Sequence, residues 1–88
     1  MDMVNDDECR AAGIDIKKVE SMARRLLRLS REMSELGIVL FGGSGSGSLR
    51  FDDGSGKGRL IIAEVGAAAF DGGDGAIMRD DSGLLRGE

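Results

Sequence analysis

The fold is decided by the stretch DIKKVESMARRLLRLSREMSEL, residues 15–36. Six apolar side chains recur in it at spacings of three and four, which places them on one stripe of an α-helix. We call them the helix stripe: Val19, Met22, Leu26, Leu29, Met33 and Leu36. Asp15 is the expected N-cap, and Gly37 is expected to end the helix because glycine adopts positive φ easily. The sequence therefore predicts one long amphipathic helix with a buried stripe.

A shorter helix is predicted over residues 6–12. Asn5 and Glu8 have the spacing of a capping box, in which the first residue caps the helix and the second reaches back to it. Gly13 is the expected stop. Residues 1–13 thus form an acidic N-terminal segment that leads into the long helix.

After Gly37 the apolar residues alternate with polar ones or fall in short runs, which is typical of strands. Strands are predicted at residues 38–41, 48–52 and 59–65, and the glycine-rich segments 42–47 and 53–58 between them suit hairpins. The predicted fold is α+β: the long N-terminal helix packed on an antiparallel β-meander of three to five short strands, in a single small domain.

A weak internal echo extends this pattern. At an offset of 29 residues Phe41 aligns with Phe70 and Asp52 with Asp81. If the echo is structural, residues 67–70 and 76–79 form a second hairpin. Residues 80–88 are polar and are expected to be a frayed tail.

Composition narrows the function classes. The chain has 88 residues, one cysteine (Cys9) and no histidine, so it has neither an intrachain disulfide nor a four-ligand Cys/His zinc site. A serine or cysteine nucleophile would lack its usual base, so an enzyme is not expected, nor is a cofactor. The acidic N-terminus has no apolar signal core, and no apolar run is long enough to span a membrane. We therefore expect a cytoplasmic protein that does not enter membranes.

The net charge is −4, yet residues 14–36 carry six Lys and Arg against four Asp and Glu. A basic row lies opposite the helix stripe: Lys17, Arg24, Arg28 and Arg31. Such a row is more often a solvated face than a phosphate-binding one, and Glu20 and Glu32 dilute it. A nucleic-acid accessory protein that uses this face remains an alternative.

Glycine-rich segments suggest a third class, a small anion or metal binder. Glycine amides approach anions closely, and the candidate loop consists of Gly43, Ser44, Gly45 and Ser46. It lacks the Lys and the following helix of a Walker A loop. Residues 52–54 and 71–75 combine Asp with Gly, but neither has the ligand spacing of an EF-hand, and turn formation explains both.

The helix stripe has a second possible use. Its heptad spacing suits a coiled-coil seam between two chains as well as packing on the sheet. With only three aromatic residues, all Phe, the chain has a thin core that a partner subunit would complete. The favoured hypothesis is a non-enzymatic interaction protein that associates with itself, as a homodimer, or with another protein.

Residues 29–37 followed by 41–47, together with 70–75, carry a resemblance. This pattern of a polar helix end and glycine-rich turns resembles small uncharacterised proteins of bacterial and prophage origin that have glycine-rich hairpin loops. The resemblance implies a bacterial or phage source and a cytoplasmic accessory role. It brings no catalytic or binding residues to this chain.

Overall fold

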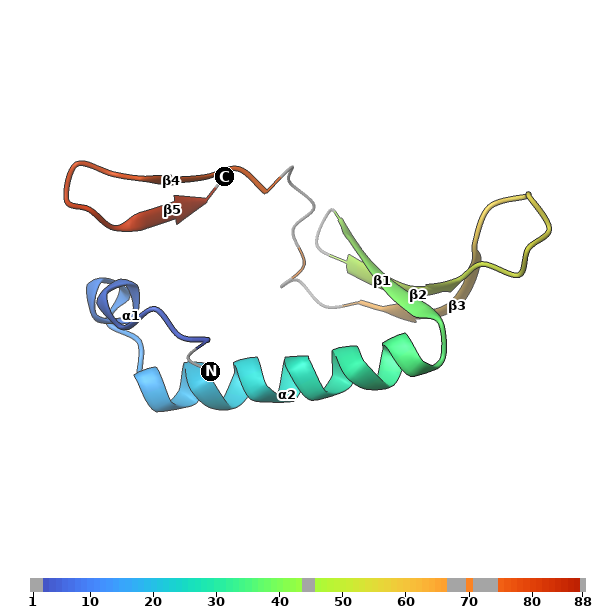
Figure 1. Ribbon diagram of the computed structural model, residues 1–88, viewed down its shortest axis with the longest axis horizontal. Helices are drawn as coiled ribbons and strands as arrows, with labels where there is room; N and C mark the ends of the chain where they lie inside the picture. The colour runs from blue at the N-terminus through green and yellow to red at the C-terminus, as the bar shows by residue number, and fades with distance from the viewer. Residues whose placement is uncertain (1–2, 44–45, 67–69, 71–74, 88) are drawn as a thin grey trace. The chain divides into compact units, whose positions relative to one another are not determined.

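The computed structural model describes residues 3–43, 46–66, 70 and 75–87. These residues form two helices and five strands (Figure 1), with the bounds α1 (Asp6–Ala12), α2 (Ile16–Glu35), β1 (Ile38–Gly43), β2 (Ser46–Phe51), β3 (Leu60–Val65), β4 (Ile77–Arg79) and β5 (Leu85–Gly87). The predicted α+β class is confirmed. The chain divides into two compact units, Met1–Ser30 with Gly75–Glu88, and Arg31–Asp74. A single domain stays a prediction.

Helix α1 begins and ends where the sequence predicts. Gly13 ends it in the left-handed region, with φ of 71°. At the other end Asn5 is the N-cap, but its side chain forms no capping hydrogen bond. The Glu8 carboxylate instead accepts a hydrogen bond from the backbone N–H of Leu85 at 2.9 Å. The predicted capping box is therefore wrong in its bonds, because Glu8 connects α1 to strand β5.

Asp80 organises the turn between β4 and β5. Its Oδ1 accepts hydrogen bonds from the backbone N–H groups of Ser82 (2.9 Å) and Leu84 (3.0 Å). Its Oδ2 lies 2.8 Å from Nε of Arg86. The hydrogen bond from Arg86, followed by that from Leu84, favours the charged carboxylate and lowers the pKa of Asp80 below its ordinary value. Residues 80–87, expected to fray, thus form a hydrogen-bonded turn and a strand.

Strand β4 confirms that residues 77–79 are extended. It pairs antiparallel with β5, with Ile77 opposite Gly87 and Arg79 opposite Leu85. The segment that the internal echo assigns as its partner, 67–70, lies outside the described residues apart from Phe70. The echo itself therefore stays a prediction.

Helix α2 is continuous over 20 residues (Figure 1). Asp15 caps it as predicted, because its Oδ1 accepts a hydrogen bond from the backbone N–H of Lys17 at 2.9 Å. Gly37 follows the helix with φ of 71°, the conformation expected of a glycine stop. On its polar side Glu20 and Arg24 form an ion pair of 2.7 Å, one turn apart.

Strands β1, β2 and β3 form an antiparallel meander in that order, as predicted. The first ladder runs from the pair Ile38 and Phe51 to the pair Gly43 and Ser46. Both strands therefore extend into the predicted loop at residues 42–47, where Gly42 pairs with Gly47 and Gly43 pairs with Ser46. Between Leu49 and Arg50 the second ladder shifts register, which is typical of a β-bulge.

Phe70 covers two glycines of this sheet. Gly42 and Gly47 are ladder partners. A Cβ atom on Gly47 would lie 2.9 Å from Cε2 of Phe70, and one on Gly42 would lie 3.4 Å from its Cβ. Glycine at these two positions leaves room for the phenyl ring, which explains why glycine is tolerated inside strands.

Little of the described chain is buried. Its buried apolar side chains are Val4 and Cys9, both in the first unit, and α2 contributes none. Fully covering an apolar side chain such as Leu stabilises a protein by about 1.5–3 kcal/mol. Many apolar side chains of the described residues are exposed, so this stabilisation is not gained within the single chain.

Candidate functional site

The helix stripe is exposed along most of its length. Leu26 is 65% exposed, and Met22, Leu29 and Leu36 are about half exposed or more, while Val19 and Met33 are partly covered. The prediction of a buried stripe is wrong for the chain on its own. The spacing of apolar residues shows which side chains favour burial, but it does not show whether the covering layer belongs to the same chain.

The sheet also presents apolar side chains. In β1, Val39, Leu40 and Phe41 are each exposed by two fifths or more, and in β3 so are Leu60, Ile61 and Ile62. Consecutive residues of a strand point to opposite faces, so both faces of the meander carry apolar surface. Isolated exposed apolar residues are ordinary, but contiguous ones mark interaction surfaces.

The basic row lies on α2 as predicted, and all four residues are exposed. Three of them meet at one hollow of about 430 Å³ on the helix surface, lined by Lys17, Glu20, Ser21, Arg24, Arg25 and Arg28. Arg24 is already paired with Glu20. Arg31 lies further along the helix, outside this hollow. The structure therefore brings together part of the predicted face and adds an acidic residue to it.

The candidate anion loop is divided by the structure. Gly43 and Ser46 are ladder partners, and Oγ of Ser46 donates a hydrogen bond to the carbonyl oxygen of Gly43 at 3.2 Å. Ser44 and Gly45 lie outside the described residues. Gly43 and Ser46 bond to each other in the hairpin, and the other two residues of the loop are not described. The anion site therefore stays a prediction.

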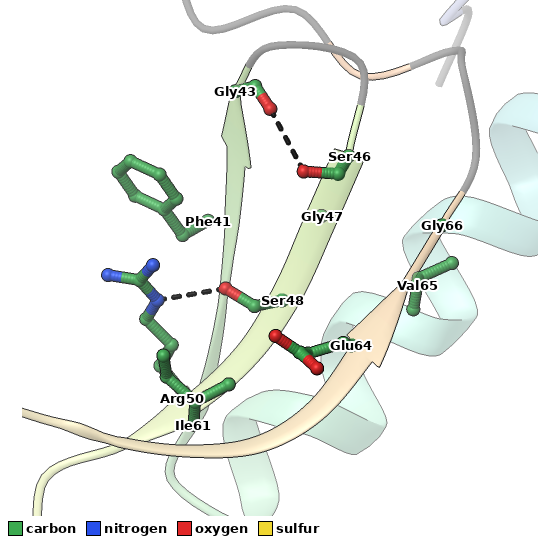
Figure 2. A pocket seen from close by; sticks show the side chains of 10 residues that line it. All are labelled: Phe41, Gly43, Ser46, Gly47, Ser48, Arg50, Ile61, Glu64, Val65 and Gly66. Atoms are coloured by element: carbon green, nitrogen blue, oxygen red, sulfur yellow. Dashed lines mark hydrogen bonds between the residues drawn. The ribbon is translucent and has the colours of Figure 1, made fainter.

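A second hollow, of about 190 Å³, opens on one face of the meander (Figure 2). The guanidinium group of Arg50 lies over the ring of Phe41, with its Cζ atom 4.1 Å from the centre of the ring. Its Nε donates a hydrogen bond to Oγ of Ser48 at 2.8 Å, and Ser48 is only 8% exposed. The aromatic face and the hydroxyl together fix the guanidinium, since cations interact favourably with the face of an aromatic ring. The lining residues are Phe41, Gly43, Ser46, Gly47, Ser48, Arg50, Ile61, Glu64, Val65 and Gly66.

Within this hollow, Ser48 holds the side chain of Arg50. Ser48 faces Glu64 across the ladder, but the structure gives no hydrogen bond between their side chains, and the serine oxygen accepts from Arg50. The bond that the structure shows for the Ser48 hydroxyl therefore orients the Arg50 guanidinium. This cluster was not predicted from the sequence, although the alternation of residues 48–51 already places Ser48 and Arg50 on one face.

In the acidic turn at residues 52–55, the carboxylates accept hydrogen bonds from backbone N–H groups of the same turn. Asp52 accepts a hydrogen bond from the backbone N–H of Gly54 (2.9 Å), and Asp53 from that of Ser55 (3.1 Å). The side-chain hydrogen bond of Ser55, followed by its backbone bond, lowers the pKa of Asp53. Within the described ranges there is no cluster of three or more metal-ligating side chains. Residues 71–74 of the other acidic segment lie outside these ranges.

Comparison with known proteins adds no family. No family model, curated protein or solved structure matches the chain. In the part of the chain that the structure describes, neither helix is long and apolar enough to cross a membrane.

Proposed function

We propose that this chain is a small non-enzymatic interaction protein that associates with copies of itself. One observation carries the proposal: α2 is 20 residues long, has a continuous apolar stripe, and buries none of its residues. A helix with one apolar stripe is stabilised mainly by packing that stripe against another element. A second copy supplies such an element, because apolar side chains that stay exposed in one chain become buried between two chains.

The sheet supports the same proposal. Exposed apolar side chains on β1 and β3 enlarge the surface available for contact. The hollow around Arg50 offers hydrogen-bonding and charged groups that suit a contact with another molecule. The proposed setting is the bacterial cytoplasm, supported by the single cysteine and by the resemblance to small bacterial and prophage proteins.

Sedimentation equilibrium from low to high micromolar concentration tests the proposal. We expect a concentration-dependent dimer for the natural sequence. Leu26→Asp places a charge in the centre of the stripe, so it should weaken association by about a hundredfold, which corresponds to about 2.8 kcal/mol. Because Leu26 is exposed in the single chain, far-UV circular dichroism of the variant should still show helix.

Ser21→Asp is the matched control. It adds the same charge to the same helix on the polar side, where Ser21 is exposed, so association should be retained. A natural chain that stays monomeric throughout the concentration range would refute self-association. Equal weakening by both variants would show that the stripe is not the surface used.

A further inference from the structure

We propose that two copies of the chain associate through an antiparallel pair of α2 helices, with Arg25 of each copy next to Glu32 of the other. This inference rests on the proposed self-association and adds its geometry. It starts from the heptad positions of α2 and of Leu36, the residue directly after it, whose backbone N–H still bonds to the carbonyl oxygen of Glu32. Along the stripe, Val19, Leu26 and Met33 alternate with Met22, Leu29 and Leu36.

The stripe pairs completely with an antiparallel copy of itself. In such a pair, each side chain of the first set packs in a layer with one of the second set from the partner. Val19 then meets the partner's Leu36, Met22 meets the partner's Met33, and Leu26 meets the partner's Leu29. Two-fold symmetry repeats these three layers, so all six layers are apolar on both sides. Shifting the helices by one heptad leaves two stripe residues of each chain without partners, Met33 and Leu36 in one direction or Val19 and Met22 in the other.

The flanks of the stripe decide the orientation. One flank carries Lys18, Arg25 and Glu32, and the other carries Ile16, Ala23 and Ser30. In an antiparallel pair, like flanks face each other, so Arg25 lies next to the partner's Glu32, twice by symmetry. The opposite charges are complementary in this register.

The second flank also fits. There Ala23 lies next to the partner's Ser30, and both side chains are small and uncharged, so the helices can approach closely. In a parallel pair the unlike flanks would meet, with Arg25 opposite the partner's Ser30 and Glu32 opposite the partner's Gly37. That arrangement forms no ion pair, so the charge pattern favours the antiparallel one.

The structure leaves both charged groups available for a partner. Arg25 and Glu32 are exposed. The only hydrogen bond that the structure shows for the Arg25 side chain, within the described residues, is a long one of 3.4 Å from Nε to the carbonyl oxygen of Ser21. Glu32 forms no ion pair with another described residue. By contrast, Arg24 on the polar face is already paired with Glu20.

Charge reversal tests this arrangement in the full chain. Arg25→Glu alone, or Glu32→Arg alone, turns both attractive pairs into repulsive ones, and each should weaken the dimer about tenfold at low salt. An equimolar mixture of the two variants should restore association as a one-to-one heterodimer, because each chain then presents two like charges to two opposite charges. Native mass spectrometry distinguishes the heterodimer, and sedimentation equilibrium gives its affinity.

Arg31→Glu and Glu35→Arg are the matched controls. They make the same charge changes on exposed positions of the same helix, away from both flanks. Each should leave association within about twofold of the natural chain, and mixing them should not select the heterodimer. Selection in this mixture equal to that of the Arg25 and Glu32 variants would overturn the proposed pairing, since overall charge would explain both.

The outcomes separate the two proposals. A natural chain that dimerises, with Arg25→Glu no weaker than Arg31→Glu, overturns the antiparallel pair and leaves self-association standing. A natural chain that stays monomeric but binds vesicles containing phosphatidylserine overturns both, because the stripe then meets a lipid surface. Weakening by both flank variants with rescue in their mixture supports the pair.

Discussion

Replacing Gly47 with alanine tests the packing of Phe70 on the sheet. The added Cβ would lie 2.9 Å from Cε2 and 3.0 Å from Cδ2 of Phe70, about 0.5 Å closer than ordinary contact begins. Gly47 is itself buried and has no positive φ, so alanine is compatible with the backbone and the clash is the main effect. Either the ring leaves the strand or the strand shifts. Overpacking of a close-packed core costs about 1–3 kcal/mol, and because the atoms met are the outer atoms of a half-buried ring, we expect a loss at the lower end of that range.

Gly42→Ala is the matched control for Gly47→Ala. Its Cβ would lie 3.4 Å from Cβ of Phe70, at the edge of ordinary contact, on the ladder partner of Gly47. There we expect no loss, or a gain of about 0.5–1 kcal/mol because alanine restricts the unfolded chain.

Urea denaturation followed by far-UV circular dichroism measures both variants, and amide exchange in β1 and β2 reports on the sheet alone. The double variant Gly47→Ala with Phe70→Leu should recover part of the loss, because the smaller side chain relieves the clash. If Gly47→Ala and Gly42→Ala have equal stability, the contact with Phe70 does not explain the glycines.

Three further changes test other parts of the fold. Asp15→Ala should cost about 0.5–2 kcal/mol, because it removes the side-chain cap of α2, and thermal denaturation should show it. In a carboxyl NMR titration the pKa of Asp80 should lie below its ordinary value of 3.8. The charged carboxylate stabilises the folded turn, and this stabilisation is fully present above pH 3.8. The β4–β5 hairpin should therefore loosen as pH falls through the lowered pKa. Asp80→Asn should loosen the hairpin at neutral pH and remove that acid dependence, as chemical shifts of Leu85 and Arg86 will show.

Local signals carried most of the fold. Helix limits at Asp15 and Gly37 followed from a side chain that caps and a residue that accepts positive φ, and both act through their nearest neighbours. The three strands of the meander followed from alternation. The loop at 42–47 was predicted too long because glycine and serine are typical turn residues. In the structure the ladder continues through them, and Phe70, far along the chain, lies over Gly42 and Gly47.

Long-range contacts could not be predicted from the sequence either, because they join residues that are far apart along the chain. Glu8 has the spacing of a capping-box residue, but its carboxylate binds the N–H of Leu85, 77 residues away. No local pattern shows that a remote amide competes for that carboxylate. The cluster of Phe41, Ser48 and Arg50 was accessible in part, since alternation places Ser48 and Arg50 on one face, but the position of Phe41 beside them depends on the ladder register.

The distribution of apolar residue types gives a physical reason for a partner at α2. All three aromatic residues lie in the second unit, where Phe70 covers the glycines of the sheet. The helix stripe instead consists of Leu, Met and Val, and unbranched, flexible Met side chains adapt well to an opposing helix. Such a stripe can be covered by a broad layer of aliphatic side chains, without an aromatic ring. On our proposal, a second α2 covers this stripe in the way that Phe70 covers the sheet, and Arg25 and Glu32 at its flank determine how that second helix is oriented.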